Sequence, residues 1–179
     1  MSATRSVFLS LAVLGAAASL SAEVLMTERQ ALERAFPGAS VERKTLYLTA
    51  DQVKAIEGAA RSRLPSAVVT VFVARRDGVG AGHAVLDTHV VRTMPETVLT
   101  VTEPDGRLRM ALVLQFGEPP DYLPREGWLK TLEGRALDDD LAAGRGVRRV
   151  TGATLTVQAL TEAVRRSLAL DQVMLRGAP

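Results

Sequence analysis

The chemically most informative stretch of the chain reads RRVTGATLT and runs from Arg148 to Thr156. It places two hydroxyls, on Thr151 and Thr154, in a turn of small residues directly before an apolar segment with helical spacing. The first amides of a helix have no partner within the helix, and together with the helix dipole they favour a negative charge. A hydroxyl at this position therefore lies where a phosphate could be held.

Local physical chemistry leaves two interpretations of this turn. Threonine is an ordinary N-cap residue, so the hydroxyls could serve only to begin the next helix. Alternatively, Gly152 and Ala153 let a bulky group approach the backbone, and the neighbouring hydroxyls and amides bind its anion. In that case Arg148 or Arg149 could pair bidentately with a phosphate, although exposed arginines need no partner and both could remain solvated.

Capping signals and apolar spacing predict the helices that surround the turn. Thr27 and Thr49 are each followed by glutamine three residues later, which is the capping-box pattern. We expect helices in four places: from Thr27 to Phe36, from Thr49 to Pro65, from Glu126 to Leu132, and from Leu155 to Leu170. The last helix has an apolar stripe, and we expect Glu162, Arg165 and Arg166 on its polar face.

The middle of the chain changes to a strand-like pattern. Valine-rich and alternating segments predict strands over Ala67–Ala74, Ala84–Val91, Thr97–Thr102 and Leu108–Phe116. A Pro-Asp-Gly turn at 104–106 joins the last two as antiparallel partners. The sequence therefore predicts an α+β fold, with an antiparallel β-sheet packed with helices in a single domain.

Composition narrows the possible functions. The 179 residues suffice for one domain, and 47% hydrophobic with 23% charged residues is typical of a folded globular chain. The formal net charge is only +2 and no basic stripe is interleaved with aromatics, so we expect no nucleic-acid partner. The chain has no cysteine, which excludes disulfides, thiol nucleophiles, iron–sulfur clusters and thiolate zinc sites.

The first residues have the pattern of an export signal. Arg5 precedes an apolar run from Val7 to Leu20, and small residues up to Ala22 offer a cleavage site. The run is shorter than the roughly 20 apolar residues of a comfortable membrane span, but a retained anchor stays possible. We therefore assign residues 1–22 to a signal peptide or membrane anchor and 23–179 to one extracytoplasmic, for example periplasmic, domain.

The turn resembles the signature of a known family. Thr151-Gly152-Ala153-Thr154 is similar to the Ser/Thr-Gly-Ala-Thr signature of the FMN-binding domain, found in the extracytoplasmic flavin subunits of the Rnf and sodium-pumping NADH:quinone reductase complexes. The segment DTHVVRTMPETVLTVTEPDGRLRMALVLQFGEPPDYLP, residues 87–124, resembles the core of small exported FMN-binding proteins. The resemblance covers most of residues 27–171, and Arg148 stands where the family usually has an aspartate.

The resemblance implies a function as well as a fold. It implies FMN attached by a phosphoester to Thr154, with a cofactor-binding segment made of Thr151, Gly152, Ala153, Thr154, Leu155 and Thr156. A flavin transferase that uses FAD as donor with a divalent cation would be the modifying partner. The protein would then be an electron carrier or redox subunit that serves membrane redox proteins, rather than a stand-alone catalyst, with no catalytic residue or metal ligand of its own. The alternative is a cofactor-free or non-covalent binding or assembly module of the same fold.

Three other groups of residues carry weaker signals. His83, Asp87 and His89 would share one face of a strand and could be metal ligands, or they could be packing or surface residues. The acidic run at 138–140 could bind a cation or form a solvated turn. Aromatic side chains near the turn could stack on a flavin ring or fill the core; they are Phe116, Tyr122 and Trp128.

Overall fold

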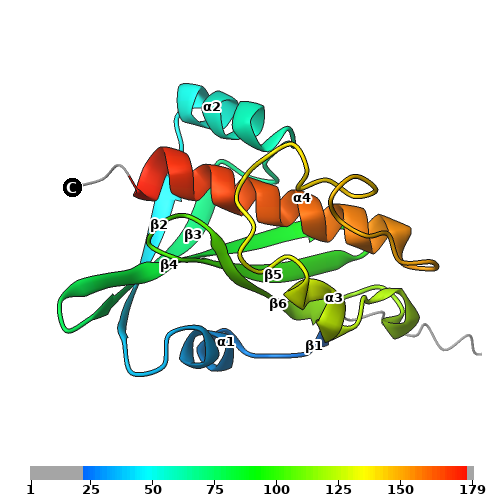
Figure 1. Ribbon diagram of the computed structural model, residues 1–179, viewed down its shortest axis with the longest axis horizontal. Helices are drawn as coiled ribbons and strands as arrows, with labels where there is room; N and C mark the ends of the chain where they lie inside the picture. The colour runs from blue at the N-terminus through cyan, green and yellow to red at the C-terminus, as the bar shows by residue number, and fades with distance from the viewer. Residues whose placement is uncertain (1–21, 177–179) are drawn as a thin grey trace, which may run out of the picture.

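A six-stranded antiparallel sheet is the centre of the fold in the computed structural model, which describes residues 22–176 (Figure 1). The strands are β1 (Glu23–Val24), β2 (Ser40–Tyr47), β3 (Val68–Arg76), β4 (Val79–Val90), β5 (Pro95–Thr102) and β6 (Leu108–Phe116). Their order across the sheet is β1-β6-β5-β4-β3-β2. The expected α+β single-domain fold with an antiparallel sheet is confirmed. The signal or anchor expected in residues 1–22 lies, apart from Ala22, outside the described residues.

Four of these six strands were predicted by the sequence, and the two-residue β1 and the longer β2 were not. Strands β3 to β6 lie within a few residues of the expected segments, and each is antiparallel to the next. Strand β2 pairs with β3 along its whole length, from Ser40 opposite Arg75 to Tyr47 opposite Val68. Most of its side chains are exposed, so it has no buried alternation for sequence reasoning to detect.

The four helices begin within one residue of their expected starts, and capping boxes set the first two. They are α1 (Glu28–Ala35), α2 (Ala50–Ala60), α3 (Glu126–Lys130) and α4 (Thr154–Leu170), with a 3-10 turn at Pro120–Tyr122 and a π-helical turn at Asp171–Leu175. Both capping boxes form, at Thr27 and at Thr49. Helix α2 ends at Ala60 instead of continuing to Pro65, because Arg61 takes a left-handed conformation with φ of 53° and so turns the chain.

The helices cover the two faces of the sheet unequally. Helices α4 and α2 lie over one face and α1 lies over the other (Figure 1).

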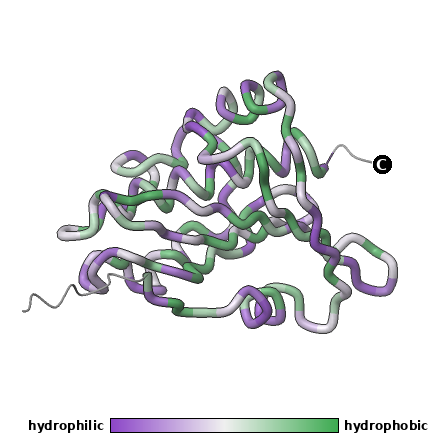
Figure 2. Tube along the Cα trace, turned by 180° about the vertical axis from the view of Figure 1, so that it is seen from behind, coloured by the Kyte–Doolittle hydropathy of each residue, from purple (hydrophilic) through white to green (hydrophobic). Residues whose placement is uncertain are grey.

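Within the described part of the chain no helix is long and apolar enough to cross a membrane. Continuous hydrophobic stretches run along the middle of the sheet, and the end of β3 at the β3–β4 hairpin is hydrophilic (Figure 2).

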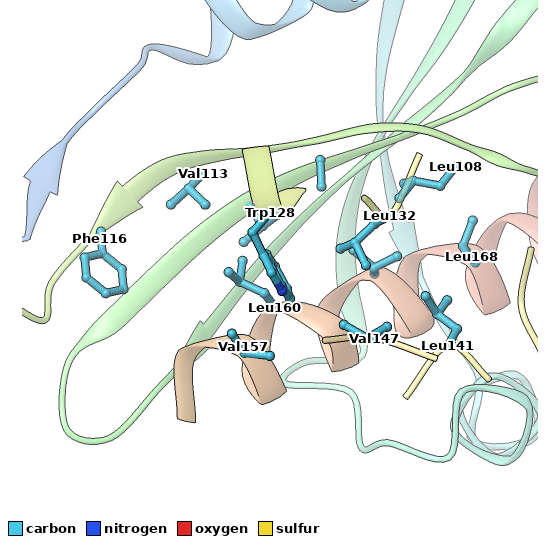
Figure 3. Close-up of a cluster of buried hydrophobic side chains, with 13 residues drawn as sticks. Leu108, Val113, Phe116, Trp128, Leu132, Leu141, Val147, Val157, Leu160 and Leu168 are labelled. Atoms are coloured by element: carbon cyan, nitrogen blue, oxygen red, sulfur yellow. The ribbon is translucent and has the colours of Figure 1, made fainter. Parts of the chain in front are cut away.

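A hydrophobic core lies between α4 and the sheet and packs against the part of the chain that carries the turn at residues 151–154. Trp128 of α3 points between β6 and α4 and packs with Leu160 and Val157 of the helix (Figure 3). The apolar side chains of this cluster are buried; among them are Val98, Leu108, Val113, Phe116, Leu132, Leu141, Val147, Val164 and Leu168. The N-terminal half of α4 is therefore held firmly against the sheet.

Helix α4 is buried on more than one side, which corrects the expected polar face. Arg165 and Arg166 are only 7% and 4% exposed. Arg165 is buried because the loop over residues 135–147 crosses the helix on the side away from the sheet, next to α2 (Figure 1). Arg166 is buried because it points toward the sheet and pairs with Asp87 of β4. Leu155, expected in the apolar stripe, is 48% exposed instead, because it lies in the first turn beyond that cover.

Candidate functional site

The sequence-predicted turn lies at the N-terminus of α4. Gly152 has a φ of +85°, a left-handed conformation that only glycine adopts without strain, and a Cβ there would have no heavy atom within 4 Å. Ala153 is the buried N-cap residue, and Thr154 is the first residue of the helix. Thr151 and Thr154 are exposed, while Thr156 is buried beneath the first turn.

Neither threonine of the turn caps the helix. No side chain accepts a hydrogen bond at the N-terminus of α4, whereas Thr27 and Thr49 each form a full capping box on their own helices. Within residues 22–176 the amides from 154 to 156 donate no hydrogen bond to a backbone or side-chain acceptor. The turn thus presents a hydroxyl beside unpaired N–H donors, which is the arrangement that binds phosphate groups.

Thr154 borders two cavities at the start of the helix. The smaller one, of about 190 Å³, is lined by the turn together with the segment after β4 and the loop after β6. The larger one, of about 510 Å³, is lined by α4, the end of α2 and the loop that crosses α4. Binding cavities for small organic ligands commonly have volumes of roughly 300–1,000 Å³, so the larger cavity is of ligand size.

Glu118 organises the wall of the smaller cavity. Its carboxylate Oε1 accepts hydrogen bonds from the amides of Arg92, Thr93 and Met94, at 3.2, 2.8 and 3.1 Å. The bond from the Thr93 amide is the main reason why the pKa of Glu118 lies below its usual value. This contact fixes the loop between β4 and β5, and with it the position of Arg92.

Tyr122 and Arg92 form the aromatic and cationic surface of the same cavity. The Arg92 guanidinium carbon lies 5.3 Å from the centroid of the Tyr122 ring, a cation–π distance. Both residues line the smaller cavity with Leu155. This surface can contact a flat conjugated ring and place a positive charge near it.

The other two aromatic candidates are core residues. Phe116 is 3% exposed and Trp128 is 4% exposed, and both belong to the cluster between α4 and the sheet. Trp128 also donates its indole N–H to the carbonyl of Arg148 at 2.7 Å, which ties the chain just before the turn to α3. Trp128 therefore positions the turn from beneath, and of the three aromatic candidates only Tyr122 lines a cavity beside Thr154.

The two arginines before the turn have different surroundings. Arg149 lines the larger cavity together with Thr154, whereas Arg148 lines neither cavity. The guanidinium of Arg149 lies against Gly144, where a Cβ would come within 2.5 Å of the Arg149 Nε. Gly144 therefore leaves the space that this arginine occupies. The geometry favours Arg149, rather than Arg148, as the arginine nearest to a group held at Thr154.

The acidic run at 138–140 forms a turn. The Asp138 carboxylate accepts hydrogen bonds from the amides of Asp140 and Leu141, at 2.9 and 2.8 Å, and Asp139 forms an ion pair of 2.8 Å with Arg61. The carboxylates of Asp138 and Asp139 are thus engaged in different contacts, and their arrangement matches the solvated-turn interpretation.

His83, Asp87 and His89 do share one face of β4, and each of them also pairs with a residue of another element. Asp87 forms a bidentate ion pair with Arg166 of α4, at 2.8 and 2.9 Å. His83 pairs with Asp171 at 2.7 Å, further along the same face. Across residues 22–176 no three His, Asp or Glu side chains are arranged to hold a metal ion.

Asp87, His89, Glu96 and Arg166 form a buried charge cluster. His89 Nδ1 lies 2.8 Å from Asp87, and its Nε2 lies 3.0 Å from Glu96 of β5. Burial works against the charged imidazole, but the hydrogen bonds that it donates to both carboxylates outweigh burial and raise the pKa of His89 to about 9. Burial raises the pKa of Glu96, while hydrogen bonds from His89 and Arg166 overcome burial and lower the pKa of Asp87. The cluster joins α4 to the sheet.

Sequence reasoning missed several residues of this region. Nothing in the sequence indicated that Arg92 and Glu118 belong to this site, because each is an isolated charge. One lies at the end of a predicted strand and the other in a predicted loop. Glu96 and Arg166 were also missed, since a charged side chain in a strand or a helix is usually solvated. A possible signal was the GEPPDY segment itself, in which three polar or aromatic side chains follow a buried strand.

Comparison of the chain with protein-family models, with curated proteins and with solved structures finds no match.

Proposed function

We propose that this protein is an exported electron carrier that holds FMN by a phosphoester to the hydroxyl of Thr154. The observation that carries the proposal is the uncapped N-terminus of α4, where an exposed hydroxyl lies beside three amides without a partner in the described chain. If the turn served only as a cap, Thr151 or Thr154 would accept a hydrogen bond from this helix, as Thr27 and Thr49 do on theirs.

The N-terminus of α4 suits the phosphate of FMN, and the smaller cavity suits part of its ring system. The phosphoester would lie at the helix N-terminus, where the amides and the helix dipole favour its negative charge. The smaller cavity offers Tyr122 as a stacking surface and Arg92 as a nearby cation, so the ring system would extend to that side. When bound, the isoalloxazine supplies the electron-transfer chemistry, and the chain supplies position and electrostatics.

The smaller cavity encloses only part of a flavin, so one edge of the ring would stay open to a redox partner. Leu155 is 48% exposed beside it and adds an apolar contact surface. The partners in this proposal are a FAD-dependent flavin transferase, which loads the cofactor, and membrane redox proteins, which exchange electrons with it. A covalent bond would keep FMN on the protein after export to the periplasm or an equivalent compartment, where lost FMN could not be recovered.

The rival is a cofactor-free or non-covalent module of the same fold. The observation in its favour is Arg148, which is exposed and stands where the resembled family carries an aspartate. A transferase that depends on that acid would leave this chain unmodified. The uncapped helix favours the FMN proposal over this rival, because no threonine cap occupies the first three amides and they are available to a phosphate.

The deciding experiment is the intact mass of the exported protein made with a working flavin transferase. Attachment adds about 438 Da, the mass of FMN less water. Thr154→Ala should abolish the added mass and the yellow colour, while Thr154→Ser, which keeps a hydroxyl, should retain part of both. Thr151→Ala is the matched control, because it removes the neighbouring exposed hydroxyl and should be modified normally.

Two results would reject covalent attachment at Thr154. The first is an unmodified mass for the wild type beside a transferase that modifies a known acceptor. The second is a full mass shift in Thr154→Ala. Yellow protein of unmodified mass that loses its flavin on denaturation and filtration would identify the non-covalent alternative.

A further inference from the structure

Strands β3 and β4 separate at one end of the sheet. Their pairing ends where Thr70 lies opposite Leu86. Beyond this point β3 still pairs with β2 as far as Val68, and β4 still pairs with β5 as far as Val90. Alternate residues of an antiparallel strand direct their N–H and C=O groups to opposite neighbours, so this part of β4 also directs backbone groups toward β3. The sheet is therefore open between the two strands.

A cavity of about 180 Å³ lies at this opening, between β3, β4 and the C-terminal half of α4. Its lining includes two exposed residues, Val68 and Thr88, and the buried apolar side chains of Val69, Val85 and Leu170. The cavity therefore reaches from the surface into the core. An apolar cavity of about 150 Å³ is large enough to bind benzene, so this one has room for a small ring.

Ser167 gives this cavity a polar group without a partner. The residue is 1% exposed and lines the cavity from α4. Within residues 22–176 its hydroxyl oxygen is buried and has no hydrogen-bond partner. A buried hydroxyl without a partner costs free energy, and a bound molecule that pairs with it would remove that cost. The hydroxyl therefore favours a ligand with one hydrogen-bonding group.

The charged residues that line the cavity neutralise each other. They are Asp87 and Arg166, which form the bidentate pair at 2.8 and 2.9 Å. The Asp87 carboxylate also contacts His89, and Arg166 donates to the Ser62 hydroxyl at 3.0 Å. An anionic ligand would compete with Asp87 for the guanidinium, and a cationic ligand would compete with Arg166 for the carboxylate. The cavity therefore favours a neutral molecule.

We propose that this cavity is a binding site for a small neutral molecule, of the size of phenol, that has an apolar ring and one hydroxyl or carbonyl group. The ring would lie among the apolar side chains of β3, β4 and α4, and its polar group would form a hydrogen bond with the Ser167 hydroxyl. Ser167 is thirteen residues from Thr154 along α4, which is about 20 Å at a rise of about 1.5 Å per residue. The site is therefore separate from the turn, and binding there does not depend on FMN at Thr154.

The test titrates the exported, isotope-labelled protein with phenol, benzene and benzoate and follows the backbone amide signals by NMR. We expect phenol to shift the signals of Val69, Asp87 and Ser167 with one saturable dissociation constant. Benzene should shift the same signals with weaker affinity, and benzoate should leave them unchanged. Ser167→Ala should weaken phenol binding about fivefold, because one hydrogen bond is lost, and should bind benzene as the wild type does.

Thr100→Val is the matched control. Thr100 of β5 is also fully buried, and its hydroxyl has no hydrogen-bond partner among the described residues, but it does not line this cavity. The control variant should bind phenol as the wild type does. It thereby separates a contact between Ser167 and the ligand from a general effect of removing a buried hydroxyl.

Three results would overturn the proposal. The first is the absence of a saturable shift at these amides up to the phenol concentration at which the protein begins to unfold. The second is benzoate that binds as tightly as phenol. The third is a Ser167→Ala variant that binds phenol no more weakly than Thr100→Val does. None of these results involves the mass of the exported protein, so a failure of this site is distinguishable from a failure of FMN attachment at Thr154.

Discussion

Replacing His89 with asparagine should remove a pH-dependent part of the protein's stability. The imidazole lies between Asp87 and Glu96, at 2.8 and 3.0 Å, and its side chain is 8% exposed. The bidentate pair of Asp87 with Arg166 stays in place in the variant. His89→Asn therefore removes the titrating group while leaving the cluster's remaining salt bridge intact.

The magnitude follows from the pKa of His89. Folding raises it from 6.5 to about 9, so the folded state binds this proton more tightly than the unfolded state. One pKa unit corresponds to about 1.4 kcal/mol, which makes the stabilisation roughly 3 kcal/mol. This stabilisation is fully present below pH 6.5 and is lost as the pH rises through 9.

Urea unfolding of both proteins at several pH values between about 6 and 9.5 measures the effect. Trp128 is the only tryptophan, and it is buried in the core, so its fluorescence reports unfolding. The difference in free energy of unfolding between wild type and His89→Asn should shrink by roughly 3 kcal/mol over this range. The comparison subtracts the titrating groups that do not contact His89. A difference that stays constant across the range would refute the assigned contacts of His89.

Three further changes test other parts of the structure. Arg166→Met leaves the buried Asp87 carboxylate without its bidentate cation. In urea titrations this variant should lose about 3–5 kcal/mol of unfolding free energy. Combining Arg166→Met with Asp87→Leu should recover much of that loss, because no buried carboxylate is then left at position 87. Thr49→Ala removes the capping box of α2 and should cost about 1 kcal/mol, while Thr49→Ser should cost little, as thermal unfolding followed by circular dichroism would measure. Gly152→Ala puts a side chain at a φ of +85° and should cost about 1–2 kcal/mol in the same assay; an unchanged midpoint would contradict the left-handed turn.

Local signals in the sequence were sufficient to predict most of the elements. The starts of α1 and α2 follow from capping boxes, in which residues three apart satisfy each other's hydrogen bonds. Strands β3 to β6 follow from apolar segments and a turn between neighbours. Strand β2 escaped prediction because it is an edge strand with exposed side chains, so only its pairing with β3 reveals it.

Helix α4 shows where a local pattern misleads. The spacing of its apolar residues indicated one buried stripe and a solvated face with Arg165 and Arg166. The loop over 135–147 and α2 cover Arg165, whereas Arg166 points toward the sheet and pairs with Asp87, so both arginines are buried with partners from outside the helix. Helical periodicity reports only that one face is apolar, and it contains no information about a second layer.

The sequence by itself determined the α+β class, the helix starts and the position of Thr154 before the last helix, since these depend on residues close together in the chain. Only the tertiary structure decided that this helix starts without a cap and that Arg92, Glu118 and Tyr122 meet beside it. It also decided that Arg149 and Arg165 face one cavity. The physical reason is that these contacts join segments from 16 residues apart, for Arg149 and Arg165, to 62 apart, for Arg92 and Thr154, and their meeting depends on how the sheet and helices pack rather than on any local pattern.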